Sequence, residues 1–233
     1  MGKPAGEGTD LRNGTPQRLG DRVNFRGAHR TSLPDAFPER LPGQKGASFA
    51  GVAGTGSDET RLIILRGNSA SGKSSTAAEI RRRHGRRDLA VVGQDNLRRD
   101  VLRERDLPAG ANIGLIDLVA RYALSRGFSV IVEGILRADH YAAMLSALID
   151  DHQGRTCCYY FEVPFDETLR RHTGKPQASE YGAVEMRDWY RELDLLPGGT
   201  EQVIPTAMSQ DEIVRRIMAD SGLAASPGLP KFE

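Results

Sequence analysis

This 233-residue sequence contains few cysteines, which limits how the fold can be stabilised. Its two cysteines, Cys157 and Cys158, are neighbours in the chain. A disulfide between neighbours is strained, and adjacent side chains on a strand point to opposite faces of a sheet. We therefore expect two reduced thiols in the core of a cytoplasmic protein.

Long apolar segments are missing as well. No apolar run approaches the roughly 20 residues that a membrane-spanning helix needs. The first ten residues, MGKPAGEGTD, lack the apolar core of a secretory signal, and Gly6 stands where a myristoylation motif requires Ser or Thr. These absences predict a cytoplasmic protein with no membrane partner.

An excess of charge of one sign is also missing. Lysine and arginine number 32, aspartate and glutamate number 31, and the formal net charge is +1. Proteins dedicated to nucleic acids usually carry a strongly basic surface. A nucleic-acid partner is therefore less favoured than a small molecule.

The two ends of the chain have few large apolar residues and no helical or strand periodicity. Residues 1–58 are rich in Gly, Pro, Arg and Asp, which predicts a disordered or loosely packed tail. A mis-assigned start codon is an alternative explanation for this segment. Residues 224–233 read as a second, shorter tail, which leaves 59–223 as one domain.

The pattern between the tails alternates between short apolar runs and amphipathic segments. Such alternation predicts an α/β fold with a parallel sheet covered on both faces, whose ligands gather at the carboxyl ends of the strands. The final helix begins with Ser209 and Glu212 at the spacing of a capping box. The expected strands are 61–65, 89–92, 128–132, 156–163 and 201–205, and the expected helices include 73–84 and 112–126.

The run after the first expected strand matches G-x-x-x-x-G-K-[ST] without a gap. Its glycines allow backbone N–H groups to approach phosphate oxygens, and the following helix directs its positive end at the same anion. Ser69 occupies the place of the middle glycine of a dinucleotide-binding loop, which argues against that fold. The predicted nucleotide-binding residues are Gly67, Asn68, Ser69, Ala70, Ser71, Gly72, Lys73, Ser74 and Ser75, with Lys73 on the β- and γ-phosphates and Ser74 on magnesium.

Acidic residues follow the second and third expected strands. Asp95 lies at the end of the second strand, where a carboxylate can take the proton of an attacking hydroxyl and contact the acceptor; it can also serve as the N-cap of a helix that begins at Asn96. Glu133 lies at the end of the third strand, where an acid can hold magnesium through water. Arg137 follows four residues later, and it either contacts the acceptor or opens the next helix.

Residues 166–194 are rich in arginine and are interrupted at Gly174 to Pro176. Two short helical pieces around a break predict a lid over the site. Phosphoryl transfer needs cations around the moving group, and lid arginines can supply them.

Together these segments resemble the P-loop kinases of the nucleoside-monophosphate-kinase type, and most closely the chloramphenicol phosphotransferase and polynucleotide kinase branches. The resemblance covers about 61–222. It implies a three-layer P-loop NTPase fold with a five-stranded parallel sheet of order 2-3-1-4-5 and a helical lid. It also implies that Asp95 is the catalytic base, that Arg137 grips the acceptor, and that Arg170 and Arg171 act on the phosphates. Glu133 departs from the family's more usual Asp.

The sequence thus predicts an ATP- and Mg²⁺-dependent kinase that transfers the γ-phosphoryl group to a hydroxyl of a small molecule such as a nucleoside, sugar or antibiotic. A 5′-hydroxyl polynucleotide kinase and a toxin-like kinase of nucleotide sugars are alternatives. A nucleotide-binding switch or slow ATPase acting on a protein partner is an alternative of another class. Acceptor pockets are built from side chains on several loops, so the motifs leave the acceptor and the oligomeric state open.

Overall fold

The computed structural model describes residues 55–174 and 181–223 of the chain. The predicted tails at 1–58 and 224–233 lie outside the described residues except for 55–58, and so does most of the predicted break in the lid. Thr55 is already buried, and its backbone is hydrogen-bonded to Asp151 and Gln153.

The centre of the fold is a five-stranded, all-parallel sheet of order β2-β3-β1-β4-β5. This confirms the predicted fold class and strand order. Its strands are β1 (Arg61–Gly67), β2 (Leu89–Gly93), β3 (Ser129–Glu133), β4 (Arg155–Glu162) and β5 (Glu201–Pro205).

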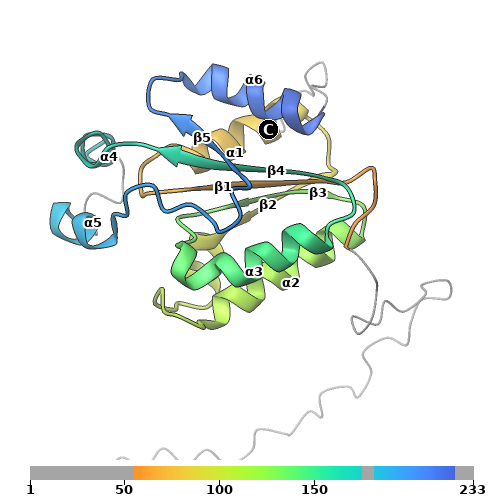
Figure 1. Ribbon diagram of the computed structural model, residues 1–233, viewed down its shortest axis with the longest axis horizontal. Helices are drawn as coiled ribbons and strands as arrows, with labels where there is room; N and C mark the ends of the chain where they lie inside the picture. The colour runs from red at the N-terminus through yellow and green to blue at the C-terminus, as the bar shows by residue number, and fades with distance from the viewer. Residues whose placement is uncertain (1–54, 175–180, 224–233) are drawn as a thin grey trace, which may run out of the picture. The chain divides into compact units, whose positions relative to one another are not determined.

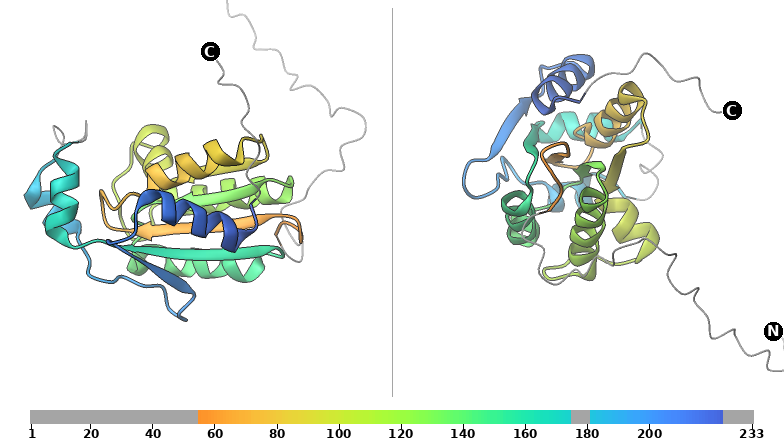
Figure 2. Two further views of the ribbon diagram at one scale, coloured as in Figure 1. Left: turned by 90° about the horizontal axis from the view of Figure 1, so that it is seen from above. Right: turned by 90° about the vertical axis from the view of Figure 1, so that its right-hand side faces the viewer.

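Helices cover both faces of the sheet, as Figure 1 shows, with α1 and α6 on one face and α2 and α3 on the other. The helices α4 and α5 lie beyond one end of the sheet in two views (Figures 1 and 2). The helical elements are α1 (Lys73–His84), the π-helical turn η1 (Asn96–Val101), α2 (Ala111–Ser125), α3 (Ala138–Asp151), α4 (Phe165–His172), α5 (Ala183–Trp189) and α6 (Gln210–Ser221).

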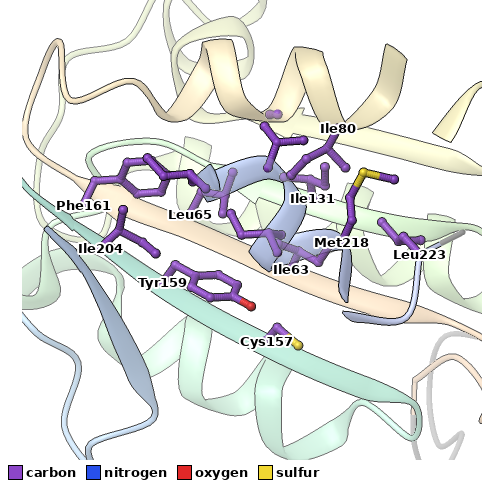
Figure 3. Close-up of a cluster of buried hydrophobic side chains, with 14 of the residues drawn as sticks. Ile63, Leu65, Ile80, Ile131, Cys157, Tyr159, Phe161, Ile204, Met218 and Leu223 are labelled. Atoms are coloured by element: carbon purple, nitrogen blue, oxygen red, sulfur yellow. The ribbon is translucent and has the colours of Figure 1, made fainter. Parts of the chain in front are cut away.

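The strand β1 is buried on both faces because it lies in the middle of the sheet. Leu62 and Ile64 pack toward α2 and α3, whereas Ile63 and Leu65 pack toward α1 and α6. Figure 3 shows the second of these clusters, in which Met218 of α6 closes over the strand side chains. Four fully buried aliphatic side chains in a row, each typically worth about 1.5–3 kcal/mol, hold the phosphate-loop end of β1 in place.

Local signals explain several helix ends. Ser209 caps α6, accepting a hydrogen bond from the Glu212 backbone N–H while the Glu212 carboxylate accepts one from the Ser209 backbone, so the predicted capping box is confirmed. The helix α1 ends at Gly85 in the left-handed conformation.

Cys157 and Cys158 are both free and buried, as predicted.

Candidate active site

The loop after β1 turns sharply enough that glycine is required. Gly67 has φ +138°, and a Cβ there would lie 2.6 Å from the carbonyl oxygen of Phe161 on β4. Ala70 and Gly72 also have positive φ, at +60° and +104°. The loop therefore folds tightly over the carboxyl end of the sheet and leads directly into α1.

Lys73, at the start of α1, lies inside this loop. Its side chain is buried, and Nζ donates hydrogen bonds to the carbonyl of Asn68 at 2.7 Å and to Ser71 Oγ at 2.9 Å. A buried ammonium needs such partners because burial of an unpaired charge is costly. The loop holds a cation at its centre.

Ser74 and Glu133 meet across the edge of the sheet. Ser74 Oγ donates a hydrogen bond of 2.9 Å to Glu133 Oε2. Glu133 is the last residue of β3, paired with Leu65 of β1, so the sheet register sets it beside the loop. Gly134 follows because a Cβ there would lie 2.5 Å from the side chain of Gln94.

Asp95 follows β2, the strand next to β3, and its carboxylate is largely exposed. Arg98 donates to Asp95 Oδ1 at 2.9 Å. A helical segment does begin at Asn96, but it is the π-helical turn η1, and the Asp95 side chain makes no capping hydrogen bond. Asp95 thus holds the N-cap position that was considered for it, but its carboxylate is engaged by Arg98 and not by the backbone of the turn.

A cavity of about 540 Å³, here cavity A, brings the loop and both acids together. Lys73, Ser74, Asp95 and Glu133 all line it. These are the residues that the sequence analysis assigned to phosphate, metal and proton transfer. The other lining residues are Ser69, Ala70, Arg99, Asp100, Gly134, Ile135 and Tyr181.

A second cavity of about 530 Å³, here cavity B, adjoins cavity A and shares Asp95 with it. Arg137 lines cavity B and is paired with Asp139, so it also opens α3 as its N-cap residue. The remaining lining residues are Ser69, Arg98, Arg99, Arg105, Asp106, Leu107, Ile135, Tyr181, Asp188 and Trp189.

The predicted lid consists of α4 and α5 in the described residues. Glu167 accepts hydrogen bonds from Arg170 and Arg171, which lower the pKa of its carboxyl to about 2. Arg170 is mostly exposed and lines neither cavity A nor cavity B. Arg171 Nη1 lies 3.4 Å from the Ser71 carbonyl oxygen and lines a third cavity of about 300 Å³, here cavity C.

Two connections around the loop were not anticipated. Asn68 and Arg191 exchange hydrogen bonds: Asn68 Nδ2 donates to the Arg191 carbonyl at 2.7 Å, and the Arg191 N–H donates to Asn68 Oδ1 at 2.9 Å. This pair ties the phosphate loop to the segment that follows α5. An asparagine inside the loop motif gives no sequence signal for a partner 123 residues away.

Arg66, directly before the loop, is fully buried and was also missed. It donates to Glu201 at 2.9 Å, to Asp194 at 3.0 Å and to the carbonyl of Leu136 at 2.8 Å. Asp194 also accepts from the Ala138 N–H. One buried guanidinium therefore joins β1, β5, the β3–α3 connection and the segment between α5 and β5.

The described residues also lack a ready-made metal-binding cluster and a membrane-spanning helix. Within residues 55–174 and 181–223, no group of three or more His, Cys, Asp or Glu side chains could hold a metal ion. A cation here would depend on few protein ligands, as magnesium at phosphates does. Among the same residues, no helix is long and apolar enough to cross a membrane.

Solved structures with similar folds include several proteins named as kinases. An APS kinase, CysC, from Mycobacterium tuberculosis, solved in complex with AMPPNP and APS, has a TM-score of 0.56 at 20% identity, over 70% of this chain and 97% of that chain. A sugar kinase from Janibacter gives 0.55 at 15% identity, over 71% and 96%. A tunicamycin resistance protein from Deinococcus radiodurans gives 0.51 at 19% identity, over 72% and 99%.

These likenesses establish a P-loop kinase-like fold. No curated protein matches the sequence significantly. A family model described as AAA domain, AAA_33, matches residues 62–195, which is more than half of the chain and includes the phosphate loop, Asp95, Glu133 and the lid. The chain therefore belongs to this AAA domain family.

Proposed function

We propose that this chain is an ATP- and Mg²⁺-dependent phosphotransferase that moves the γ-phosphoryl group of ATP to a hydroxyl group of a small molecule. The observation that carries the proposal is the composition of cavity A. A loop lysine, a loop serine and two carboxylates from the ends of β2 and β3 line one space. Nucleotide binding alone has no use for Asp95.

The loop residues account for the nucleotide. Lys73 Nζ, now bonded to Asn68 and Ser71, exchanges these partners for the β- and γ-phosphate oxygens. Positive φ values at Gly67, Ala70 and Gly72 allow successive N–H groups to turn toward an anion. The N-terminus of α1 adds its partial positive charge.

Ser74 and Glu133 fit a magnesium ion by the chemistry of their donors. Both present hard oxygen atoms within 2.9 Å of each other, and Mg²⁺ prefers one or two such ligands together with water and phosphate. When bound, the ion neutralises charge on the phosphates. In its presence Ser74 would be a ligand and Glu133 would orient ligand water.

Asp95 has the position and exposure of a general base. The acceptor hydroxyl oxygen forms a bond to the γ-phosphorus as the bond from that phosphorus to the β–γ bridging oxygen breaks. The hydroxyl proton passes to Asp95, and ADP leaves. Arg98 holds the carboxylate from one side, at Oδ1, which leaves Oδ2 for the hydroxyl.

Lid arginines supply the remaining charge. Arg171 stands beside Ser71 of the phosphate loop at the edge of cavity C, and Arg170 is one residue away. Closure of α4 and α5 would transfer these guanidinium groups from Glu167 to phosphate oxygens. Kinases named for sugars and for APS share this fold, which supports a small-molecule acceptor.

The test is ATP turnover with magnesium over a panel of nucleosides, sugars, phenicol and aminoglycoside antibiotics and 5′-hydroxyl oligonucleotides. Wild type is compared with Asp95→Asn, which keeps one oxygen for Arg98 but removes the base. Loss of a general base typically costs a factor of about 10² to 10⁴. Arg98→Gln is the matched variant, because it removes the ion pair and retains the carboxylate.

We expect one acceptor class to stimulate turnover, and Asp95→Asn to lose far more activity than Arg98→Gln. ATP hydrolysis that no acceptor stimulates and that Asp95→Asn leaves unchanged would overturn the proposal in favour of a switch or slow ATPase. Turnover of oligonucleotides alone, falling steeply with salt, would point to a polynucleotide kinase.

A further inference from the structure

The residues that line cavity B indicate the chemical class of the acceptor, which the sequence motifs leave open. Cavities A and B share Ser69, Asp95, Arg99, Ile135 and Tyr181. If Asp95 receives the proton of the acceptor hydroxyl, as proposed above, the rest of the acceptor extends into cavity B. The walls of cavity B therefore select the acceptor.

Guanidinium groups dominate the polar wall of cavity B. Arg98, Arg99, Arg105 and Arg137 line it. Arg98 and Arg99 lie in η1, Arg105 lies between η1 and α2, and Arg137 directly precedes α3, so the cations come from two separate connections of the fold. Arginine suits planar, bidentate recognition of phosphate and similar oxyanions better than any other side chain.

Two of the three carboxylates that line cavity B already have partners. Asp95 is paired with Arg98. Asp106 accepts hydrogen bonds from the Tyr141 hydroxyl at 2.8 Å and from Gln94 at 3.3 Å. Burial, followed by the hydrogen bond to Asp106, raises the pKa of Tyr141. Asp188 is the third carboxylate, at the exposed end of the lid helix α5.

Arg105 differs from Arg98 and Arg137, which also line cavity B. Within the described part of the chain it makes no hydrogen bond or ion pair, whereas Arg98 is held by Asp95 and Arg137 by Asp139. It lies on the same short connection as Asp106 and Leu107, which also line the cavity. A cation placed at a cavity wall without a carboxylate partner is suited to an anionic ligand.

The size and the apolar part of cavity B limit the ligand further. About 530 Å³ is within the range of small-molecule sites. Leu107, Ile135 and Trp189 line the same space and can cover an apolar or flat portion of the ligand. The space suits one small compound with one charged end.

We infer that the acceptor is a small hydroxyl compound that also carries an oxyanion ester, a phosphate or a sulfate, held by Arg105 with Arg99 and Arg137 while its hydroxyl faces Asp95. This inference rests on the proposed kinase function. It excludes neutral sugars and nucleosides and cationic aminoglycosides as the preferred acceptors.

The experiment compares matched pairs of acceptors that differ only in the anionic group. The pairs are ribose and ribose 5-phosphate, glucose and glucose 6-phosphate, glycerol and glycerol 3-phosphate, and adenosine and adenosine 3′-monophosphate. Glucose 6-sulfate separates a requirement for phosphate from a requirement for any tetrahedral oxyanion. Transfer is measured as kcat/KM for each acceptor, and ATP binding is measured separately by calorimetry.

The key variant is Arg105→Gln, with Arg103→Gln as its control. Both arginines are exposed on the β2–α2 connection, but Arg103 does not line cavity B. We expect at least one ester to be a far better acceptor than its neutral partner. Arg105→Gln should lower kcat/KM for that ester about tenfold to a hundredfold, the range of a hydrogen bond to a charged group, and mainly through KM. Arg103→Gln should match wild type.

The two proposals fail differently. Transfer that is equally fast or faster to the neutral member of each pair would overturn the anionic acceptor and leave the kinase standing. The same holds for an ester whose kcat/KM is unchanged by Arg105→Gln. Tight ATP binding with no transfer to any member of the panels would overturn the proposed function and this inference with it.

Discussion

The Ser74 hydroxyl donates a 2.9 Å hydrogen bond to the Glu133 carboxylate, although 59 residues separate them in the chain. The parallel pairing of β1 with β3 brings them together, because it places Glu133 opposite Leu65 at the end of the strand that precedes the loop. This contact joins the loop motif to the acid after β3, and it suggests a first test.

Glu133→Gln should weaken the Mg²⁺ dependence of the proposed phosphotransferase activity. A glutamine keeps the size of the side chain but removes the charge that would orient ligand water. Groups that orient metal ligands typically contribute about 10- to 100-fold in metal affinity or activity. The measurement is turnover against Mg²⁺ concentration, with the exposed Glu59→Gln as control. A Mg²⁺ dependence equal to that of wild type would contradict a role for Glu133 at the metal.

Gly67→Ala should destabilise the protein more than Gly72→Ala. Both positions have positive φ, so each alanine adds backbone strain of about 1–3 kcal/mol. A Cβ at Gly67 would also meet the Phe161 carbonyl at 2.6 Å, whereas a Cβ at Gly72 would meet nothing within 4 Å. The free energies of unfolding in urea measure the difference. Equal losses would show that β4 does not press on the loop.

Glu201→Gln should unfold the protein at a markedly lower urea concentration. The fully buried Arg66 guanidinium pairs with two carboxylates, those of Glu201 and Asp194. The substitution removes the charge of the first and leaves the second. Removal of one partner of a buried ion pair typically costs about 3–5 kcal/mol. Glu79→Gln removes a carboxylate from a pair near the surface and is the matched control, with a much smaller expected loss. Similar urea midpoints of unfolding for the two variants would contradict a stabilising role of the buried Arg66 ion pairs.

His152 should make stability depend on pH below neutrality. Burial, and the nearby charge of Arg61, lower the pKa of this imidazole from its ordinary 6.5. The unfolded state then binds a proton that the folded state resists. The contribution is complete above about pH 6.5 and is lost as the pH falls from there through the folded-state pKa.

The measurement is the free energy of unfolding between pH 8 and pH 5 for wild type and His152→Gln. The difference between the two proteins isolates the contribution of His152 from that of the rest of the chain. We expect that difference to shrink as the pH falls, because the wild type loses a contribution that the variant lacks. A difference that does not change with pH would contradict the prediction.

Much of the fold could be predicted from local patterns. The helix at 73–84 and the strand at 201–205 have the bounds expected from periodicity, and the Ser209 cap was readable from two residues. Small differences occur where the pattern is weak: the third strand was expected at 128–132 and spans Ser129–Glu133, which brings Glu133 into the sheet. The strand order followed from the family resemblance, because periodicity does not encode which strands are neighbours.

The sequence by itself determined the phosphate loop, because its spacing is a local backbone requirement, and it determined the α/β class, because alternating segments require a parallel sheet. Only the tertiary structure decided which side chains face each other across the loop. Arg66 looks like any charged residue at the end of a strand, yet Glu201 and Asp194 converge on it from more than 120 residues away. The role proposed for Arg105 likewise follows only from the cavity that it lines. Such contacts depend on how separate segments pack, and a linear pattern carries no record of that packing.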